Sequence, residues 1–150
     1  MLIKRLQAED LEDLVKLEVR AFEVGPYSLE MLEYALQEAG DMAFKIEESK
    51  RIAAYIIASP ISDESIDIES VAVDPDFRGK GLAKSLMNYV ENMAKEMGFK
   101  RMQLEVREFN MEAIGLYKKL GYELKELLKN YYSEKLKGSR NAYRMEKLLA

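Results

Sequence analysis

The sequence predicts a single mixed α/β domain in which a central sheet of about seven strands carries about four helices on its two faces. Three observations support this. Apolar residues alternate in some segments and recur at helical spacing in others, the segments follow one another without a linker or repeat, and glycines stand at several segment ends. At 150 residues, the chain can bury about two-thirds of its unfolded surface in one core. We therefore treat residues 1–150 as one domain.

The first half of the chain begins with a short apolar strand and two helices. In residues 10–22, Leu11, Leu14 and Leu17 form a helical stripe, and Ser28 is a suitable N-cap for the helix that follows. A polar turn at 48–50 divides two apolar segments and predicts a hairpin. In order, the predicted elements are a strand at 1–6, helices at 10–22 and 29–39, two strands within 42–59 and a strand at 66–73.

The second half continues with alternating helices and strands. Gly98 and Gly121 each follow an amphipathic segment and are expected to end helices. In residues 101–107, Met102, Leu104 and Val106 alternate with polar residues, which predicts a strand with one buried face. In order, the predicted elements are helices at 82–97 and 111–120, separated by the strand at 101–107, and closing strands at 122–128 and 142–149.

Composition excludes several kinds of chemistry. The chain has no cysteine and no histidine, so we expect no disulfide and no thiolate or imidazole metal site, and acid–base chemistry falls to Glu, Asp, Tyr or Lys. The formal charge of -4 argues against general nucleic-acid binding. No signal peptide, long apolar segment or basic block indicates a membrane. We expect a cytoplasmic protein.

The stretch DPDFRGKGLAKSL at 74–86 predicts a phosphate-binding loop. A strand that leads through glycines into a helix leaves backbone N–H groups free at the positive end of the helix dipole. The P-loop spacing fails because Arg78 and Ala83 replace its glycines, and the dinucleotide-binding spacing fails at Lys84. Residues 78–83 fit R-x-x-G-x-A instead.

The stretch VAVDPDFRGKGLAKSLMNYV at 71–90 resembles the acyl-CoA pyrophosphate loop of the GNAT acetyltransferase superfamily, and LEVREFNMEAIGLYKKLGYE at 104–123 resembles its second CoA-contacting motif. The resemblance implies the GNAT fold and acetyl-CoA as cosubstrate. It places pantetheine beside splayed strand ends and pyrophosphate on loop amides, and it adds Asn110 and Tyr117 as CoA contacts. The implied CoA-binding residues are Val71, Ala72, Val73, Arg78, Gly79, Lys80, Gly81, Leu82, Ala83, Lys84, Asn110 and Tyr117.

A narrower resemblance is to the N-terminal protein acetyltransferases, both the bacterial ribosomal-protein alanine type and the archaeal type. It rests on FEVGPYS at 22–28, LEVR at 104–107 and NYYSEKLKGSRNAYRM at 130–145. The implied substrate is the N-terminus of a protein or peptide, with a ribosomal protein as one candidate, and the implied contacts are Tyr131, Tyr132 and Tyr27. An acidic stretch usual in that branch is replaced by residues 138–141 (GSRN).

Acetyl transfer to an amine needs a neutral amine, a polarised carbonyl and a proton for the departing thiolate. The resemblance implies Glu105 as the base and Tyr117 as the acid, although Glu105 could instead be a paired surface carboxylate and Tyr117 a core residue. Asp67, Glu69 and Glu23, or a water chain, remain alternative bases, and Glu69 is also a candidate substrate contact. We expect a backbone N–H near Val71 or Ala72 to hold the oxyanion.

Two other functions remain open on the sequence. A GNAT enzyme that acetylates a lysine side chain or a small-molecule amine would fit the altered residues 138–141, whereas the tyrosine pair argues against it. A non-catalytic acyl-CoA-binding module would bind CoA without turnover. The oligomeric state and the preferred first residue of the acceptor are left open.

Overall fold

The computed structural model describes residues 2–150, and its helices and strands follow the predicted order, which confirms the expected seven-stranded sheet with four helices. The elements are β1 (Ile3–Arg5), α1 (Leu11–Ala21), α2 (Leu29–Ala39), β2 (Ala43–Glu48), β3 (Arg51–Pro60), β4 (Ser65–Val73), α3 (Leu82–Glu96), β5 (Arg101–Arg107), α4 (Met111–Lys119), β6 (Glu123–Leu128) and β7 (Ala142–Leu148). Short 3-10 turns at Ala8–Asp10 and Pro75–Phe77 precede α1 and α3.

Local sequence explains where several elements begin. The side chain of Ser28 accepts the backbone N–H of Met31 and caps α2, as expected. The helix expected from residue 10 is preceded by a 3-10 turn, because the carboxylate of Asp10 accepts the backbone N–H of Gln7 at 2.8 Å. The described first strand is shorter than residues 1–6, and residue 1 lies outside the described part.

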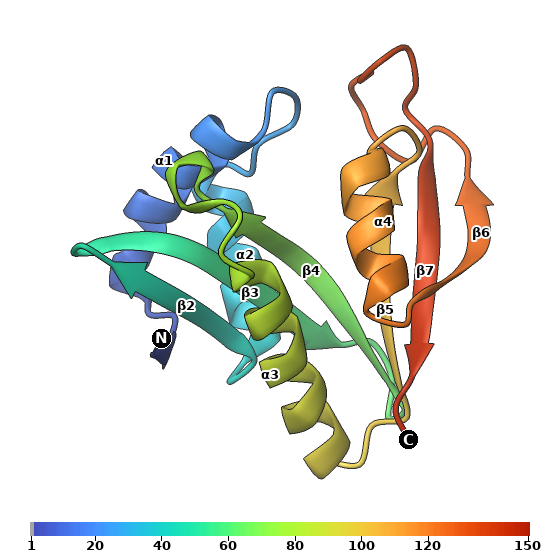
Figure 1. The fold of residues 1–150 in the computed structure, drawn as a ribbon, viewed down its shortest axis with the longest axis horizontal. Helices are drawn as coiled ribbons and strands as arrows, with labels where there is room; N and C mark the ends of the chain where they lie inside the picture. The colour runs from blue at the N-terminus through green and yellow to red at the C-terminus, as the bar shows by residue number, and fades with distance from the viewer. Residues whose placement is uncertain (1) are drawn as a thin grey trace.

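The sheet has the order β1-β2-β3-β4-β5-β7-β6 and is antiparallel except between β4 and β5. These two parallel strands pair only from Ser65 to Ile68 on β4 and from Arg101 to Leu104 on β5. Beyond those residues the strands diverge, as Figure 1 shows between the green β4 and the orange-yellow β5. The rest of β4 has no partner on that side, so the sheet has a splay at its centre.

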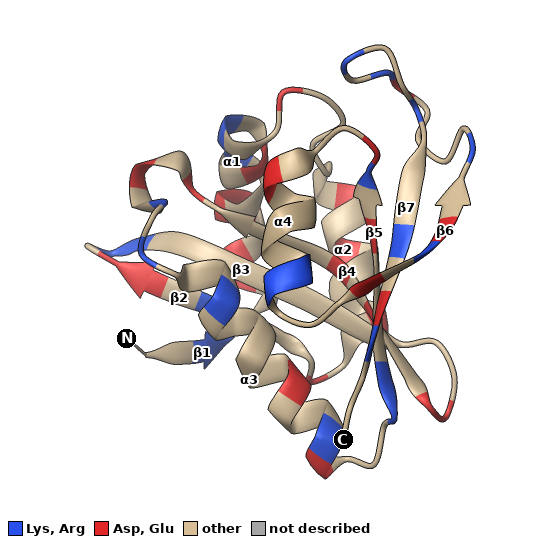
Figure 2. Ribbon diagram, turned by 45° about the vertical axis from the view of Figure 1, so that its right-hand side comes forward, with Lys and Arg blue, Asp and Glu red and all other residues tan. Residues whose placement is uncertain are grey.

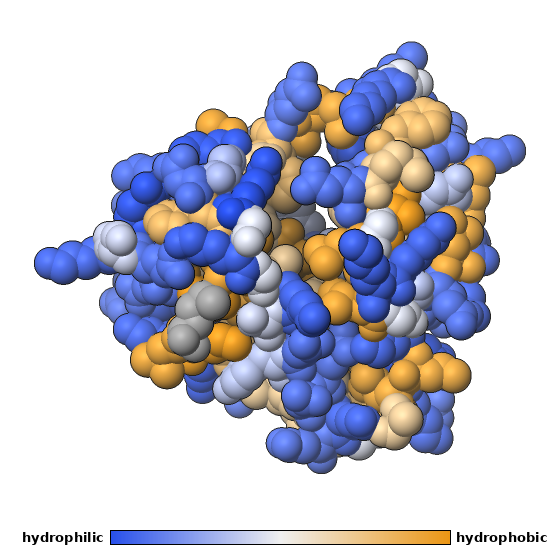
Figure 3. Space-filling view, in the orientation of Figure 1, coloured by the Kyte–Doolittle hydropathy of each residue, from blue (hydrophilic) through white to orange (hydrophobic). Residues whose placement is uncertain are grey.

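Each face of the sheet has its own helices and core. Helices α3 and α4 cover the face at the front of Figure 1, and α1 and α2 lie behind the sheet. The front core includes Ile66, Leu86 and Met102, and the rear core includes Leu14, Leu32 and Tyr55. Figure 3 shows the front surface hollowed between the α3 side and the α4 side, with apolar surface at the edges of the hollow. Both faces of the sheet therefore reach the splay.

Candidate active site

A β-bulge at Glu69 marks the point where β4 turns away from β5. Ile57 pairs with Ser70 and Ala58 pairs with Ile68, so Glu69 has no partner on β3. A bulge bends its strand and re-aims the neighbouring side chains. The carbonyl oxygen of Glu69 accepts a hydrogen bond from the Tyr27 hydroxyl at 3.1 Å. The bulge thus creates a contact between the splay and the loop that joins α1 to α2.

After the bulge, the residues expected to line pantetheine occupy the free part of β4. Val71 and Val73 are partly buried against the front core, whereas Ala72 belongs to the rear core. Because β5 does not pair with this segment, its backbone groups on the β5 side have no strand partner. Such N–H groups are the kind that can hold a carbonyl oxygen as it gains negative charge.

The expected phosphate loop follows directly and has the geometry that an anion requires. Gly79 and Gly81 have φ values of +82° and +74°, a left-handed conformation that glycine adopts without strain. The first backbone bond of α3 joins the N–H of Ser85 to the carbonyl of Gly81, so the N–H groups of residues 82–84 lack helical partners. No acidic residue lies in the first turn of α3.

Within this loop, side chains and backbone divide their roles. Leu82 is buried in the core and Ala83 is partly buried, so both can offer only their amides. The ammonium of Lys80 pairs with Glu48 at 2.9 Å, and the Arg78 guanidinium lies 3.4 Å from the carbonyl of Ala21. Lys84 is exposed at the start of α3. The backbone is therefore the main candidate for phosphate contact.

A buried aspartate anchors the start of the loop. The side chain of Asp74 is fully buried, pairs with the guanidinium groups of Arg20 and Arg51, and accepts the backbone N–H of Asp76 at 3.0 Å. Burial opposes ionisation, but the Asp76 N–H and the Arg20 guanidinium outweigh it and hold the pKa of Asp74 below its ordinary value. Asp74 therefore holds the loop as a carboxylate.

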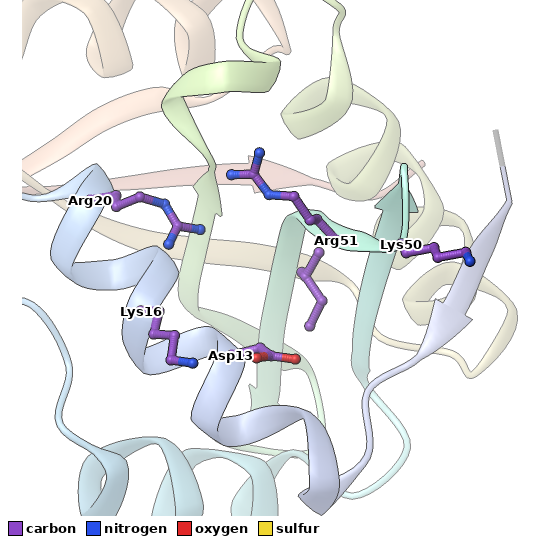
Figure 4. A pocket seen from close by; sticks show the side chains of 6 residues that line it. Asp13, Lys16, Arg20, Lys50 and Arg51 are labelled. Carbon is purple, nitrogen blue, oxygen red and sulfur yellow. The ribbon is translucent and has the colours of Figure 1, made fainter.

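The same two arginines line a hollow of about 180 Å³ on the α1 side of the molecule, together with Asp13, Lys16 and Lys50 (Figure 4). Figure 4 shows the side chains of Arg20 and Arg51 extending from α1 and from the start of β3. Both guanidinium groups are paired with Asp74, so the arginines that line this hollow stabilise the loop. The hollow is not part of the splay.

Glu105 lies on the rear face of β5, where Gln103, Glu105 and Arg107 alternate with buried apolar residues. The Glu105 carboxylate accepts hydrogen bonds from the Gln103 amide at 3.2 Å and from the Arg144 guanidinium at 3.2 Å. The Glu105 carboxylate therefore forms an ion pair with Arg144 of β7. This contact holds the carboxylate in place at the edge of the splay.

Asp67 is the buried neighbour of this carboxylate. Its side chain lies 3.5 Å from the same Gln103 amide, and the residue is only 6% exposed. Burial, the charge of Glu105 and a hydrogen bond with Glu69 raise the pKa of Asp67 to about 9. At neutral pH Asp67 therefore holds a proton and is a poor base, which leaves Glu105 and Glu69 as the nearby alternatives. Glu23, the remaining alternative, is exposed on the loop between α1 and α2.

Tyrosines from two separate loops approach this acidic group. Tyr131 and Tyr132 lie between β6 and β7, with ring centroids 5.0 Å apart, and the guanidinium of Arg107 stacks 4.0 Å above the Tyr132 ring. Burial and the charge of Glu105 raise the pKa of Tyr131 to about 12. Tyr27, on the opposite side, has its pKa raised by burial and by the charges of Glu69 and Glu18. The three expected substrate contacts therefore surround the rear of the splay.

Tyr117 lies on α4 and packs against the front core. Its ring packs edge-on against Tyr122 with centroids 6.1 Å apart. Burial and the Tyr132 phenol raise the pKa of Tyr117 to about 12, so it remains a proton donor at neutral pH. Asn110 caps α4, since its side-chain oxygen accepts the backbone N–H of Ala113 at 3.2 Å. This capping role is compatible with the expected contact of Asn110 with CoA.

Sequence reasoning missed Glu18. This carboxylate on α1 is 1% exposed, accepts the backbone N–H of Tyr27 at 2.8 Å and accepts the Tyr55 hydroxyl at 2.7 Å. Since Tyr55 gives its proton to Glu18, the Ser70 hydroxyl 2.7 Å away is the donor to Tyr55. Burial raises the pKa of Glu18. The sequence did contain one signal for Glu18. It is an acidic residue that directly follows Leu17 on the apolar stripe of the helix predicted at residues 10–22.

No helix in residues 2–150 has both the length and the apolar character needed to cross a membrane. Over the same residues, no group of three or more Asp, Glu, His or Cys side chains is placed to hold a metal ion.

A sheet splayed beside a glycine-rich helix start defines a class of acyl-transfer proteins, and the comparison with known families agrees. The Acetyltransferase (GNAT) family profile matches residues 8–122. The chain therefore belongs to the GNAT acetyltransferase family. This also confirms the resemblance drawn from the two sequence motifs.

Individual relatives share nearly the whole chain. The [ribosomal protein bS18]-alanine N-acetyltransferase of Haemophilus influenzae is 32% identical over 141 residues, covering 94% of each chain. The structure of Ard1 from Thermoplasma volcanium has a TM-score of 0.91 at 27% identity and covers 99% of this chain and 97% of that chain. A structure of the NatB acetyltransferase complex bound to CoA and MES has a TM-score of 0.83 at 26% identity, with 100% of both chains covered.

Proposed function

We propose that this protein transfers an acetyl group from acetyl-CoA to the α-amino group at the N-terminus of a protein or peptide. The observation that carries the proposal is the arrangement of the splay: a phosphate-binding loop and Tyr117 lie toward one face, and an acidic group with three tyrosines lies at the other. Two substrates can therefore approach one point from opposite faces and react directly in a ternary complex.

The residues present fit acetyl-CoA. The free amides of 82–84 and the two left-handed glycines suit a pyrophosphate, and the unpaired edge of β4 suits an extended pantetheine arm. When bound, acetyl-CoA supplies a thioester carbonyl that an amine can attack. A backbone N–H near Val71 or Ala72 stabilises the negative charge that develops on that carbonyl oxygen.

The proton transfers are assigned to two side chains. An α-amine has a pKa of about 8, so a usable fraction is neutral at pH 7 and a modest base is sufficient. Glu105 accepts the proton that the attacking nitrogen loses, directly or through a water molecule. Tyr117 donates a proton to the sulfur as the carbon–sulfur bond breaks, which leaves acetylated amine and free CoA.

The acceptor is held between the loop that carries Tyr27 and the loop that carries Tyr131 and Tyr132. Names of relatives support this choice, because they include an alanine N-acetyltransferase of a ribosomal protein. A ribosomal-protein N-terminus in the cytoplasm is the first substrate to examine.

The test measures CoA release from acetyl-CoA with short peptides that differ in their first residue. Each peptide is paired with a copy that has a blocked N-terminus and an internal lysine. We expect activity on free N-termini alone. Activity only on the blocked lysine peptides would transfer the assignment to a lysine acetyltransferase. CoA binding without activity on either set would point to a small amine or to a non-catalytic acyl-CoA sensor.

A further inference from the structure

A second cavity, of about 320 Å³, opens beside the candidate site on the α2 side. We call it the α2 pocket. Two of its residues, Tyr27 and Glu69, also belong to the rear of the splay. An acceptor peptide that enters the splay therefore passes this pocket directly. Its lining residues are Tyr27, Glu30, Met31, Tyr34, Ala35 and Glu69.

The lining combines apolar contact surface with negative charge. Met31 and Tyr34 are large side chains on α2 that are 49% and 65% exposed, and both line the pocket. Glu30 and Glu69 contribute a carboxylate each, from α2 and from the bulge in β4. The Glu38 side chain raises the pKa of Tyr34, so a third acidic group lies near the pocket.

The α2 pocket has one wall from the segment that includes α2 and one wall from β4, and neither segment contains a positive side chain. Residues 21–44, which include α2, have five acidic residues and no lysine or arginine, and residues 52–77, which include β4, also lack lysine and arginine. Figure 2 colours the acidic positions of these elements red. No internal cation from these walls neutralises the pocket carboxylates, so a cation from outside is favoured there.

We propose that the α2 pocket binds the side chain of a lysine or arginine at the second or third position of the acceptor peptide. The inference rests on the proposed function. The aliphatic part of such a side chain would lie along Met31 and Tyr34 while its charged end pairs with Glu30 or Glu69, since long basic side chains combine an apolar stem with a charged head.

The position in the peptide follows from strand geometry. Glu69 lies two residues before Val71 on β4, and an extended chain advances about 3.3 Å per residue. A peptide whose amine reaches the Val71 region therefore carries its second and third residues past Glu69. The basic preference belongs to the α2 side alone, because the opposite loop contains Lys129, Lys135, Lys137 and Arg140.

The test compares peptides that are identical except at the second or third position, where each carries lysine, norleucine or glutamate. Norleucine retains the aliphatic stem and removes the charge. We expect kcat/KM to be about five- to tenfold higher for lysine than for norleucine at one of these positions, and lowest for glutamate. Arginine should follow lysine, and high salt should reduce the difference.

Two protein variants test whether the α2 pocket causes the preference for lysine over norleucine. Glu30→Gln should lower the lysine-to-norleucine ratio toward one. Glu33→Gln is the matched control, because Glu33 is exposed on the same helix but does not line the pocket, and it should leave the ratio unchanged.

Equal rates for lysine and norleucine, a preference for glutamate, or an equal effect of both variants would overturn the inference while leaving the proposed function intact. If no free N-terminus in the panel is acetylated, the proposed function fails and the inference fails with it.

Discussion

At the scale of single residues, the geometry separates the two proposed proton transfers. Tyr117 belongs to the side of the sheet where the phosphate loop begins, and Glu105 belongs to the side with the tyrosine loops. A general acid can stay protonated while a nearby general base stays ionised, because the two groups have different environments. Tyr117 is a partly buried phenol that packs against the front core, whereas Glu105 is paired with Arg144.

Tyr117→Phe should lower kcat by about a hundredfold or more, because it removes the proton donor but retains the ring. CoA affinity should change little. Steady-state kinetics together with a CoA titration would check this. Tyr89→Phe is the control, since Tyr89 is a half-exposed tyrosine on α3. Unchanged turnover in Tyr117→Phe would eliminate Tyr117 as the acid.

Glu105→Gln should flatten the low-pH limb of the kcat/KM profile, since that limb reports protonation of the essential base in the free enzyme. Glutamine can still contact Gln103, so the local structure should persist. The measurement is a pH series with one good peptide. A limb that persists in the variant would assign the base to Glu69 or to a water chain instead.

At the scale of elements, Glu18 connects α1 to the substrate loop and to the sheet. Its carboxylate holds the backbone of Tyr27, while Tyr55 and Ser70 link the same group to β3 and β4. The hydroxyl of Tyr27 then contacts the bulge at Glu69. Glu18 is therefore a positioning residue, because it acts through Tyr27 and does not itself reach the splay.

Glu18→Ala should raise KM for the peptide more than it lowers kcat, because the loop loses its anchor. It should also destabilise the fold by about 1–3 kcal/mol, since the buried Tyr55 hydroxyl and the partly buried Tyr27 N–H lose their acceptor. Thermal unfolding and peptide kinetics measure the two effects. Glu18→Gln should rescue part of both, because an amide oxygen can still accept from Tyr27.

Glu12→Ala is an exposed substitution on the same helix, and it should change neither the stability of the fold nor the KM for the peptide. If Glu18→Ala lowers stability and leaves KM for the peptide unchanged, Glu18 has a purely structural role.

At the scale of the whole molecule, the buried Asp67 links stability to pH. Its pKa is raised to about 9 in the folded protein from an ordinary value of 3.8. Between these values the folded state keeps a proton that the unfolded state releases. This contribution to stability is complete below about pH 4 and is lost as the pH rises toward about 9.

Asp67→Asn should therefore make the protein more stable than the parent at about pH 8, with a smaller difference at about pH 5. A gain of about 1 kcal/mol corresponds to ~2–4 °C in Tm for a domain of this size. Thermal unfolding across this pH range is the measurement. Asp63→Asn, on the exposed loop before β4, is the control. A variant that follows the parent at every pH would show that Asp67 is ionised in the folded protein.

Much of the fold was accessible from the sequence because its signals are local. The helical stripe of α1, the cap at Ser28 and the alternation in β5 each depend on residues that are close in the chain. The phosphate loop was predictable for the same reason, since glycines, strand end and helix start are contiguous. The observed boundaries differ from the predicted ones by one or two residues.

Residues that are close together in the chain define the elements, the order in which they occur and the glycine-rich loop with its free amides. The surroundings of each acidic group depend on the tertiary fold. Arg144 pairs with Glu105 across β5 and β7, Asp67 is buried beside them, and Glu18 lies within reach of Tyr27 and Tyr55. Protonation depends on desolvation and on charges brought close by folding from distant parts of the chain, so it is absent from any local pattern.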